Sequence, residues 1–271
     1  MKDYDWLKTT LYKYRKFDAR TLSMLINREI YFANPENLND PHDCQISIAA
    51  AILEAISIAK KRHPSSLTLP KVNLLRKLAS ISPKMETDIK STGVFSLSRT
   101  SKNVLMWTHY ADEHRGLCIG FRLSNKFLTV NDESKVVGTN QCGYFPNNPF
   151  VDYLVNIGVT EELLPWSDFW MRIFSIGLVA KHNSWKYEQE VRVVRKEPGT
   201  EWFQPKEIVE IIFGLNMDSE DRKTVIKLLS SPEWAHVKLS KMTKSSGSFG
   251  LEKVPLSKSE IILSPFVKAR A

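Results

Sequence analysis

The stretch LYKYRKFDARTLSMLINREIYF, residues 11–32, predicts two short strands with a helix between them. Residues 11–15 have the composition of a strand, and residues 29–32 form a second strand that ends before Asn34-Pro35. Between them, residues 19–27 carry Leu22 and Leu25 at helical spacing, and Asp18 is a suitable N-cap. The chain therefore begins with mixed α and β structure.

The same mixture continues along the chain without regular βαβ alternation. Strands are predicted at residues 93–97, 117–121, 135–139, 190–194 and 208–213, and a final β region begins at 237–239. Helices are predicted at 46–61, 72–79, 104–111, 161–182 and 219–229, the last with Ser219 as its N-cap. This order predicts an α+β fold with a mixed, mainly antiparallel sheet and helical insertions near 46–90 and 161–182. We expect one domain over residues 1–242 and a C-terminal extension, 243–271, that packs on it.

Composition and cysteine content favour a cytoplasmic protein. The 271 residues are 42% hydrophobic and 25% charged, which is typical of a globular domain. The three cysteines show no CxxC or zinc spacing, and Cys118 lies in an apolar run, so a reducing compartment is expected. The charged start of the chain lacks the apolar core of a signal peptide. The most apolar stretch of the whole chain, residues 171–180, is too short to span a bilayer, so no membrane partner is expected.

The charge balance favours an anionic partner. A net charge of +8 and a pI near 9.3 attract nucleic acids and nucleotides, although a lysine-rich surface can also serve solubility alone. The sequence contains no GxGxxG, GxxxxGK[ST], HExxH or GxSxG motif. If the chain is an enzyme, its active site is therefore assembled from separated segments.

Four segments carry polar and aromatic residues that folding alone does not require. They are residues 12–15, residues 31–43, residues 95–116 and residues 185–192. The first could be an edge strand with a solvated arginine, and turn formation is the simpler explanation of the second. In the third, His109 and Tyr110 share one face of the predicted helix with Met106 and Glu113. A histidine in this setting is more often structural than catalytic.

The fourth segment combines two carboxylates with a guanidinium. On a strand, Glu188, Glu190 and Arg192 would share the face opposite Val191 and Val193. Burying these charges unpaired would be costly, so they belong on a solvated face or in a cleft. An internal ion pair between Glu190 and Arg192 is the alternative.

Together the four segments resemble the domain-of-unknown-function 2971 family of bacteria and their mobile elements. The resemblance rests on residues 12–15, on 30–35 with 39–41, on 105–111 with 116–121, and on 185–192, and it covers roughly residues 10–230. The family implies no general activity for the chain.

The order of Arg15, Ser96, Ser98 and Glu190 is also similar to the Arg, Ser-Thr-Ser and Glu-x-Glu pattern of one class of ADP-ribosyltransferases, with Leu97 in place of the middle Thr. This resemblance implies an ADP-ribosyltransferase-like fold and activity with NAD, as in a toxin or a phage-defence effector that modifies nucleic acid or protein.

The same resemblance implies roles for individual residues. Arg15 would hold the NAD phosphates, Ser96 and Ser98 would brace the site, Glu190 would stabilise the oxocarbenium-like transition state, and Glu188 would help to deprotonate the acceptor. The remaining residues expected to contact the nucleotide are Tyr12, Tyr31, His109, Tyr110 and Arg192.

Two other functions fit the same segments. The first is a non-catalytic nucleic-acid or nucleotide binder, in which the stacking candidates are Tyr12, Tyr14, Tyr31, Trp107 and Tyr110. The second is a metal-dependent nuclease that uses Asp40, Asp43, Glu188 and Glu190, with Lys186 on a phosphate.

Overall fold

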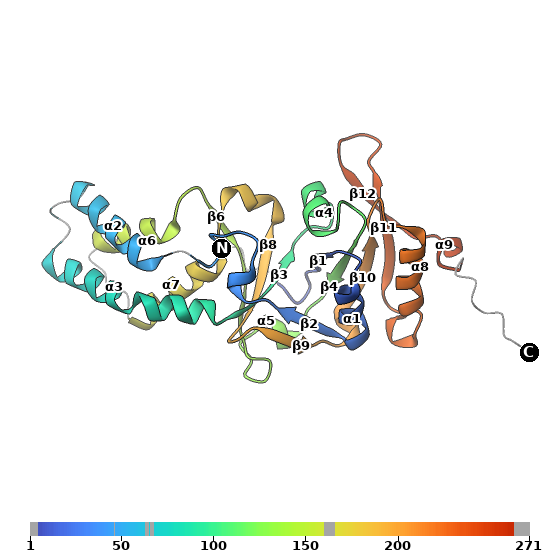
Figure 1. The fold of residues 1–271 in the computed structure, drawn as a ribbon, viewed down its shortest axis with the longest axis horizontal. Coiled ribbons are helices and arrows are strands. Elements are labelled where there is room, and N and C mark those ends of the chain that lie inside the picture. The colour runs from blue at the N-terminus through green and yellow to red at the C-terminus, as the bar shows by residue number, and fades with distance from the viewer. Residues whose placement is uncertain (1–4, 46, 63–64, 66–67, 160–165, 263–271) are drawn as a thin grey trace, which may run out of the picture.

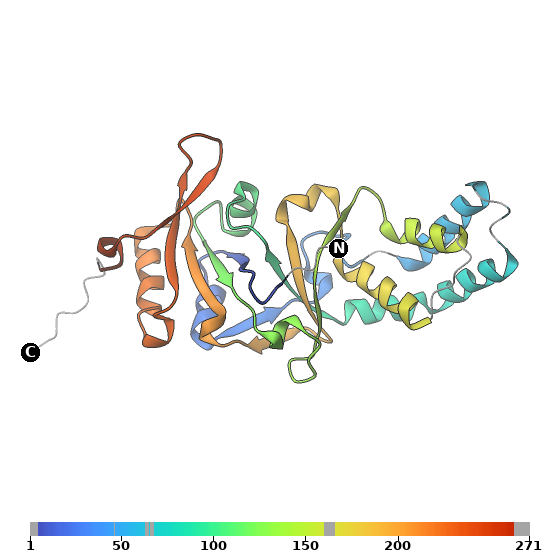
Figure 2. The same cartoon turned by 180° about the vertical axis from the view of Figure 1, so that it is seen from behind.

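A computed structural model describes residues 5–45, 47–62, 65, 68–159 and 166–262 of the chain. The molecule is elongated, with a sheet in its middle, a lobe of helices at one end and the C-terminal strands at the other (Figure 1). The view from behind shows the same two ends separated by the sheet (Figure 2).

The main sheet has eight strands in the order β12-β11-β10-β4-β1-β3-β8-β5. Its strands are β1 (Leu11–Arg15), β3 (Gly93–Ser98), β4 (Leu117–Phe121), β5 (Val136–Gln141), β8 (Glu190–Arg195), β10 (Ile208–Phe213), β11 (Lys238–Lys244) and β12 (Leu251–Pro255). Every neighbouring pair is antiparallel except β10 and β11. This confirms the predicted α+β class with a mixed, mainly antiparallel sheet.

Two small sheets flank the main one. β2 (Glu29–Phe32) pairs with β9 (Gly199–Trp202) in antiparallel fashion, and β6 (Gly143–Phe145) pairs with β7 (Ala180–His182) in parallel. The predicted boundary of the C-terminal extension, at residue 242, falls within β11. Residues 263–271 of that extension lie outside the described residues.

Nine α-helices and four 3₁₀ helices are present in the described residues. The α-helices are α1 (Ala19–Asn27), α2 (Ile48–Arg62), α3 (Leu69–Lys90), α4 (Val104–Tyr110), α5 (Asn125–Leu128), α6 (Pro149–Val159), α7 (Trp166–Val179), α8 (Ser219–Leu228) and α9 (Lys258–Ile262). The 3₁₀ helices are η1 (Pro35–Asn37), η2 (Asn183–Glu188), η3 (Pro205–Glu207) and η4 (Pro232–Trp234). The helical lobe consists of α2, α3, α6 and α7, which pack around their own apolar core.

Alternation along β8 distributes its side chains between two cores. Val191 and Val193 point into the largest core, where they meet Phe95 and Phe121 from other strands. Arg192 points to the opposite face, as the sequence predicted. On that opposite face, α4 covers β1 and β4 with the fully buried ring of Trp107.

The main sheet is split between β1 and β3. These strands share one residue pair, Tyr12 with Ser98, whereas β1 pairs with β4 over five residues and β3 with β8 over six. The remainder of β1 therefore diverges from β3, and unpaired strand edges face each other across the opening.

Several predicted helices have different limits in the structure. The helix predicted at 72–79 extends from Leu69 to Lys90. The helix predicted at 161–182 begins at Trp166 and ends at Val179, where β7 follows, and its predicted first residues, 161–165, lie outside the described part of the chain. Helix α8 is capped by Asp218, whose side chain accepts from the Glu220 backbone N–H, so the assignment of Ser219 as N-cap was wrong by one residue.

Helix α6 was not predicted. It begins after Asn148, whose side chain accepts from the Phe150 backbone N–H, and it has Pro149 in its first turn. Asn followed by Pro is a helix-start signal, so the sequence did contain the information.

Candidate functional site

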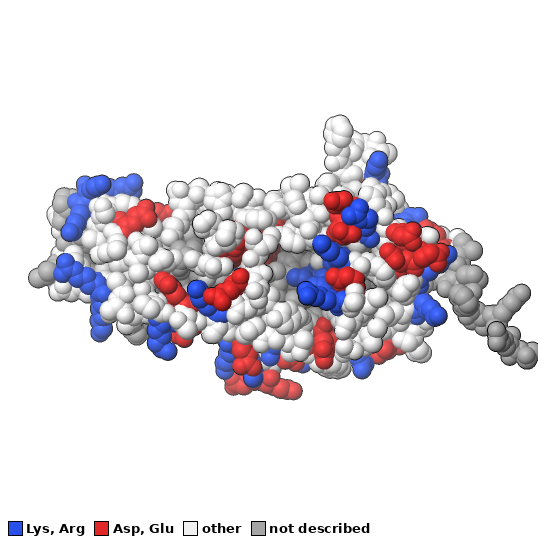
Figure 3. All heavy atoms as spheres, viewed as in Figure 1, with Lys and Arg blue, Asp and Glu red and all other residues white. Residues whose placement is uncertain are grey.

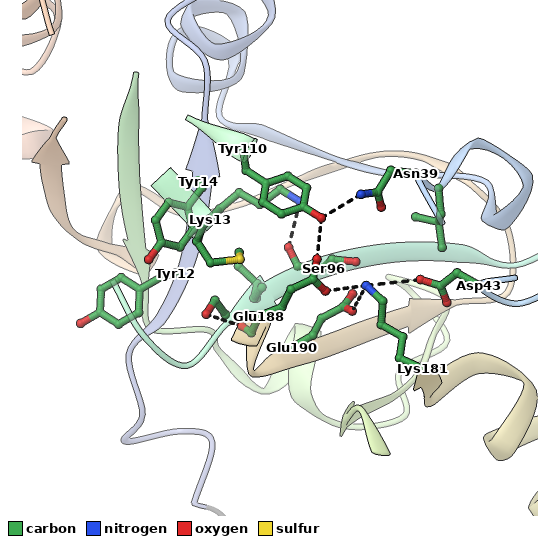
Figure 4. A pocket seen from close by; sticks show the side chains of 14 residues that line it. Tyr12, Lys13, Tyr14, Asn39, Asp43, Ser96, Tyr110, Lys181, Glu188 and Glu190 are labelled. Carbon is green, nitrogen blue, oxygen red and sulfur yellow. Dashed lines mark hydrogen bonds and ion pairs between the residues drawn. The ribbon is translucent and has the colours of Figure 1, made fainter. Parts of the chain in front are cut away.

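A cleft opens where β1 and β3 part, and it has two adjoining chambers. The inner chamber encloses about 140 Å³ between β1, β3, α4 and η2. Its lining includes Tyr12, Lys13, Tyr14, Asn39, Asp43, Ser96, Ser98, Tyr110, Lys181, Glu188 and Glu190 (Figure 4). These residues come from segments that are far apart in the sequence.

The outer chamber is larger and more basic. It encloses about 820 Å³, within the range of sites for nucleotide-sized ligands, and is lined by Arg15, Arg20 and Tyr31 among others. Lys13, Leu38 and Ser96 line both chambers, so the two chambers adjoin at the split between β1 and β3. The space-filling view shows basic side chains gathered over β1 and α1 next to a hollow (Figure 3).

A buried ion network forms the floor of the inner chamber. The Arg192 guanidinium donates to both carboxylate oxygens of Asp43, at 2.7 and 2.5 Å, and to both of Glu190, at 2.8 and 3.0 Å. The Lys181 ammonium lies 2.5 Å from Glu188, 3.0 Å from Glu190 and 3.6 Å from Asp43. Three carboxylates and two cations leave this network with one negative charge.

The network sets the ionisation of Glu190. Burial alone would raise the pKa of Glu190, but the charges of Arg192 and Lys181 and a hydrogen bond from the Ser96 hydroxyl hold that pKa well below its usual range. Glu190 is therefore a carboxylate whose oxygens are already engaged. The ion pair with Arg192, weighed as the alternative from sequence, is present.

Glu188 differs from Glu190 in its surroundings. It lies at the end of η2, so it is not on the strand face where the sequence placed it. Its carboxylate accepts from the Tyr110 hydroxyl at 2.5 Å and from Lys181 (Figure 4). Burial and the neighbouring charge of Glu190 raise the pKa of Glu188 against the opposing effect of Lys181. A carboxylate with a raised pKa is suited to accept a proton.

Lys13 connects the two chambers. Its ammonium donates to the Ser96 carbonyl at 2.8 Å across the split and lies 5.1 Å from the centre of the Phe95 ring. Burial, followed by the nearby charge of Arg15, lowers the pKa of Lys13 to about 8. Lys13 therefore changes its charge close to neutral pH.

The structure brings most of the sequence-predicted site residues to this cleft. Tyr12, Ser96, Ser98, Tyr110, Glu188 and Glu190 line the inner chamber, and Arg15 and Tyr31 line the outer one. The phenol groups of Tyr12 and Tyr14 donate to the Glu210 carboxylate and to the Thr100 carbonyl, and they point away from Glu188 and Glu190 (Figure 4). Ser98 donates to the Glu188 carbonyl and so positions the end of η2.

Other predicted residues lie elsewhere. Arg192 is fully buried beneath Glu190 and lines neither chamber, so it cannot touch a ligand directly. His109 is exposed beside Tyr110 at the edge of the inner chamber. Trp107 is completely buried and donates to the Ser101 carbonyl, so its assignment as a stacking residue was wrong.

The acidic residues do not form a metal centre in the described part of the chain. There, no group of three or more His, Cys, Asp and Glu side chains is placed to hold a metal ion. Asp43, Glu188 and Glu190 do converge, but the Lys181 ammonium occupies the position between them. Asp40 faces a separate pocket next to His42. This arrangement gives the nuclease hypothesis little support.

Sequence reasoning missed Lys13, Asn39 and Lys181 as site residues. Lys13 lay inside the first segment, and Asn39 inside the second, where its amide donates to the Tyr110 hydroxyl at 2.8 Å. Lys181 lies two residues after the end of the apolar helix α7, and a lysine at the end of such an apolar stretch is a signal that sequence reasoning could have used. Nothing in the spacing of the sequence connects Lys181 with Glu188 and Asp43, because the fold alone brings them together.

One comparison with known proteins gives a match over part of the chain. Residues 106–193 match the family model described as Protein of unknown function (DUF2971). The match begins within α4 and ends within β8, so it includes Tyr110, Lys181, Glu188 and Glu190, and it confirms the resemblance over that range. Neither the curated proteins nor the solved structures give a match. No helix in the described residues is long and apolar enough to cross a membrane.

Proposed function

We propose that the protein binds NAD in the cleft and transfers its ADP-ribose group to an acceptor, with Glu188 as the catalytic carboxylate. The observation that carries the proposal is the union of a basic outer chamber and a carboxylate-floored inner chamber in one cleft. A dinucleotide has this same division, since its pyrophosphate is anionic and its nicotinamide ribose becomes positive when the glycosidic bond breaks.

The outer chamber supplies the cations that a pyrophosphate needs. Arg15, Arg20 and Lys13 line it, and guanidinium groups bind phosphate oxygens in pairs. Lys13 and Ser96 line both chambers and so connect these cations with the chamber that contains Glu188. Tyr31 is exposed on the same wall and could stack on a base.

The inner chamber offers the charge that the reaction requires. The bond between the nicotinamide nitrogen and ribose C1′ breaks with its electron pair on nicotinamide, and the acceptor forms the new bond to C1′. Glu188 would stabilise the positive ribose and accept the proton released by the acceptor. Glu190 would serve as a positioning residue, because the Arg192 guanidinium donates to both of its oxygens, whereas the partners of Glu188 are the neutral Tyr110 hydroxyl and the Lys181 ammonium.

Nicotinamide release from NAD by the purified full-length protein tests this assignment. We expect the wild type to release nicotinamide and Glu188→Gln to lose at least a hundredfold of the rate, while NAD still binds. Glu197→Gln, a change in an exposed glutamate, is the matched control and should keep the wild-type rate. Equal rates in Glu188→Gln and the control would contradict the proposal.

Growth of bacteria that express the protein extends the test to an effector role. We expect wild-type expression to slow growth and to lower cellular NAD, and Glu188→Gln to do neither. Saturable NAD binding without nicotinamide release in any condition would favour the second candidate, a non-catalytic nucleotide binder. That alternative is favoured by Lys181, which neutralises part of the charge of both glutamates.

A further inference from the structure

A row of four rings runs along the edge of the inner chamber between α4 and η2. The ring centres of Trp185 and Tyr187 are 6.1 Å apart, those of Tyr187 and His109 are 6.1 Å apart, and those of His109 and Tyr110 are 6.4 Å apart. We call these four residues the aromatic row. Its last member, Tyr110, donates to Glu188 and lines the chamber, so the row leads directly to the candidate catalytic carboxylate.

Packing of the core accounts for the row only in part, since Tyr110 and Tyr187 pack against the core beneath α4 whereas Trp185 does not. Trp107 and Tyr14 already fill the core beneath α4, with their rings edge to face at 5.2 Å. In the row, His109 is exposed and the three other rings are only partly buried. Trp185 covers the Lys181 ammonium with one face, at 4.9 Å from the ring centre. Aromatic rings with accessible surface side by side are typical of sites that stack on bases.

The charges beside the row suit a polyanion. Lys186 stands in the same 3₁₀ helix as Trp185 and Tyr187, and Lys102 stands next to Asn103, whose amide donates to the Tyr187 carbonyl at 3.2 Å. Both lysines are exposed, and neither forms an ion pair with another residue among those the structure describes. The chain as a whole carries +8. Cations interleaved with rings are the pattern that binds unpaired nucleic-acid strands.

We propose that the aromatic row binds single-stranded nucleic acid and delivers a base to the inner chamber. Stacking on the rings requires bases that are not paired in a duplex, which is the reason to favour a single strand. The proposal that the aromatic row binds a strand is independent of the proposed activity. Only the second step, in which the bound strand is the acceptor of ADP-ribose at Glu188, rests on the proposed function.

Fluorescence anisotropy with a dye-labelled single-stranded oligothymidylate tests the surface. We expect the wild type to bind it, more weakly at 200 mM than at 50 mM salt, and to prefer it over a duplex of equal length. Trp185→Ala should weaken binding by about 5- to 100-fold, and Trp185→Phe should restore most of it. Lys186→Ala should lower the salt dependence of binding by about 0.7 in log–log slope.

Trp202→Ala is the matched control, because Trp202 is an exposed tryptophan on β9 that is not part of the row. It should bind the strand as the wild type does. If Trp185→Ala unfolds, His109→Ala replaces it, since His109 is exposed and its loss should weaken binding without affecting stability. Binding that is unchanged in these row variants, or that favours duplex, would overturn the proposal.

The two proposals fail separately. Strand binding that depends on Trp185, without nicotinamide release, would remove the transferase and leave the row as a nucleic-acid site. Nicotinamide release that continues without any strand binding would keep the transferase and remove the row.

Discussion

Replacing Arg192 by methionine should strongly destabilise the fold. The guanidinium is fully buried and donates to both oxygens of Asp43, both oxygens of Glu190 and the Leu178 carbonyl. Methionine keeps much of the volume but leaves two buried carboxylates with Lys181 as their remaining charged partner. Breaking a buried ion pair from one side typically costs about 3–5 kcal/mol.

That cost has a thermal and a pH signature. For a domain of this size, a loss of about 1 kcal/mol in the free energy of unfolding lowers the midpoint of thermal unfolding by about 2–4 °C. The midpoint of Arg192→Met should therefore fall by about 6–20 °C. Because the pKa of folded Glu190 lies below its unfolded value, its stabilising contribution is present above the unfolded pKa and is lost as pH falls through the folded pKa. Without Arg192 the pKa of Glu190 in the folded state rises. The difference in the free energy of unfolding between the wild type and Arg192→Met should therefore be largest near neutral pH and should become smaller in acid.

Urea unfolding of both proteins between pH 4 and pH 8, followed by circular dichroism, measures this difference. Lys196→Met, which removes an exposed pair with Asp132, is the control and should change stability by less than about 0.5 kcal/mol. A loss below about 1 kcal/mol in Arg192→Met, or a loss that does not depend on pH, would refute the reasoning.

Three further predictions address the cleft and its support. Gly116→Ala should destabilise the protein by at least about 1–3 kcal/mol in urea unfolding, because its Cβ would lie 2.1 Å from a backbone carbonyl oxygen, whereas Gly247→Ala meets nothing and should be neutral. NAD affinity measured by calorimetry should fall as pH rises through about 8, where Lys13 loses its charge, and Lys13→Met should bind weakly with no such step. Tyr110→Phe should cost about 1.5–3 kcal/mol in urea unfolding, because Glu188 loses a charge-assisted hydrogen bond; an unchanged midpoint would contradict that contact.

The local elements of the fold were largely predictable from sequence, because they depend on neighbours in the chain. Periodicity identified β1, α1, β2, β3, α4, β4, β8 and β10 close to their observed limits, and Asp18 caps α1 as expected. The order of strands was not predictable, since the position of β1 between β3 and β4 depends on contacts between distant segments. The split that opens the cleft is a property of that order.

The site was predictable in its parts but not in its arrangement. The segments that carry Tyr12, Ser96, Tyr110 and Glu188 were recognised from residue types that folding does not require. The different surroundings of Glu188 and Glu190 could not be foreseen, because the 3₁₀ helix that ends at Glu188 interrupts the alternation on which the prediction relied. Lys181 reaches Glu188 because the helical lobe packs against the sheet, and no local sequence pattern predicts that packing.

A crystal structure of the protein soaked with NAD tests the central claim most directly. We expect the pyrophosphate within hydrogen-bond distance of Arg15 or Arg20 and the nicotinamide ribose beside the Glu188 carboxylate, with the ligand lying at the split between β1 and β3. A cleft that stays empty at saturating NAD, or NAD bound at another surface, would contradict it.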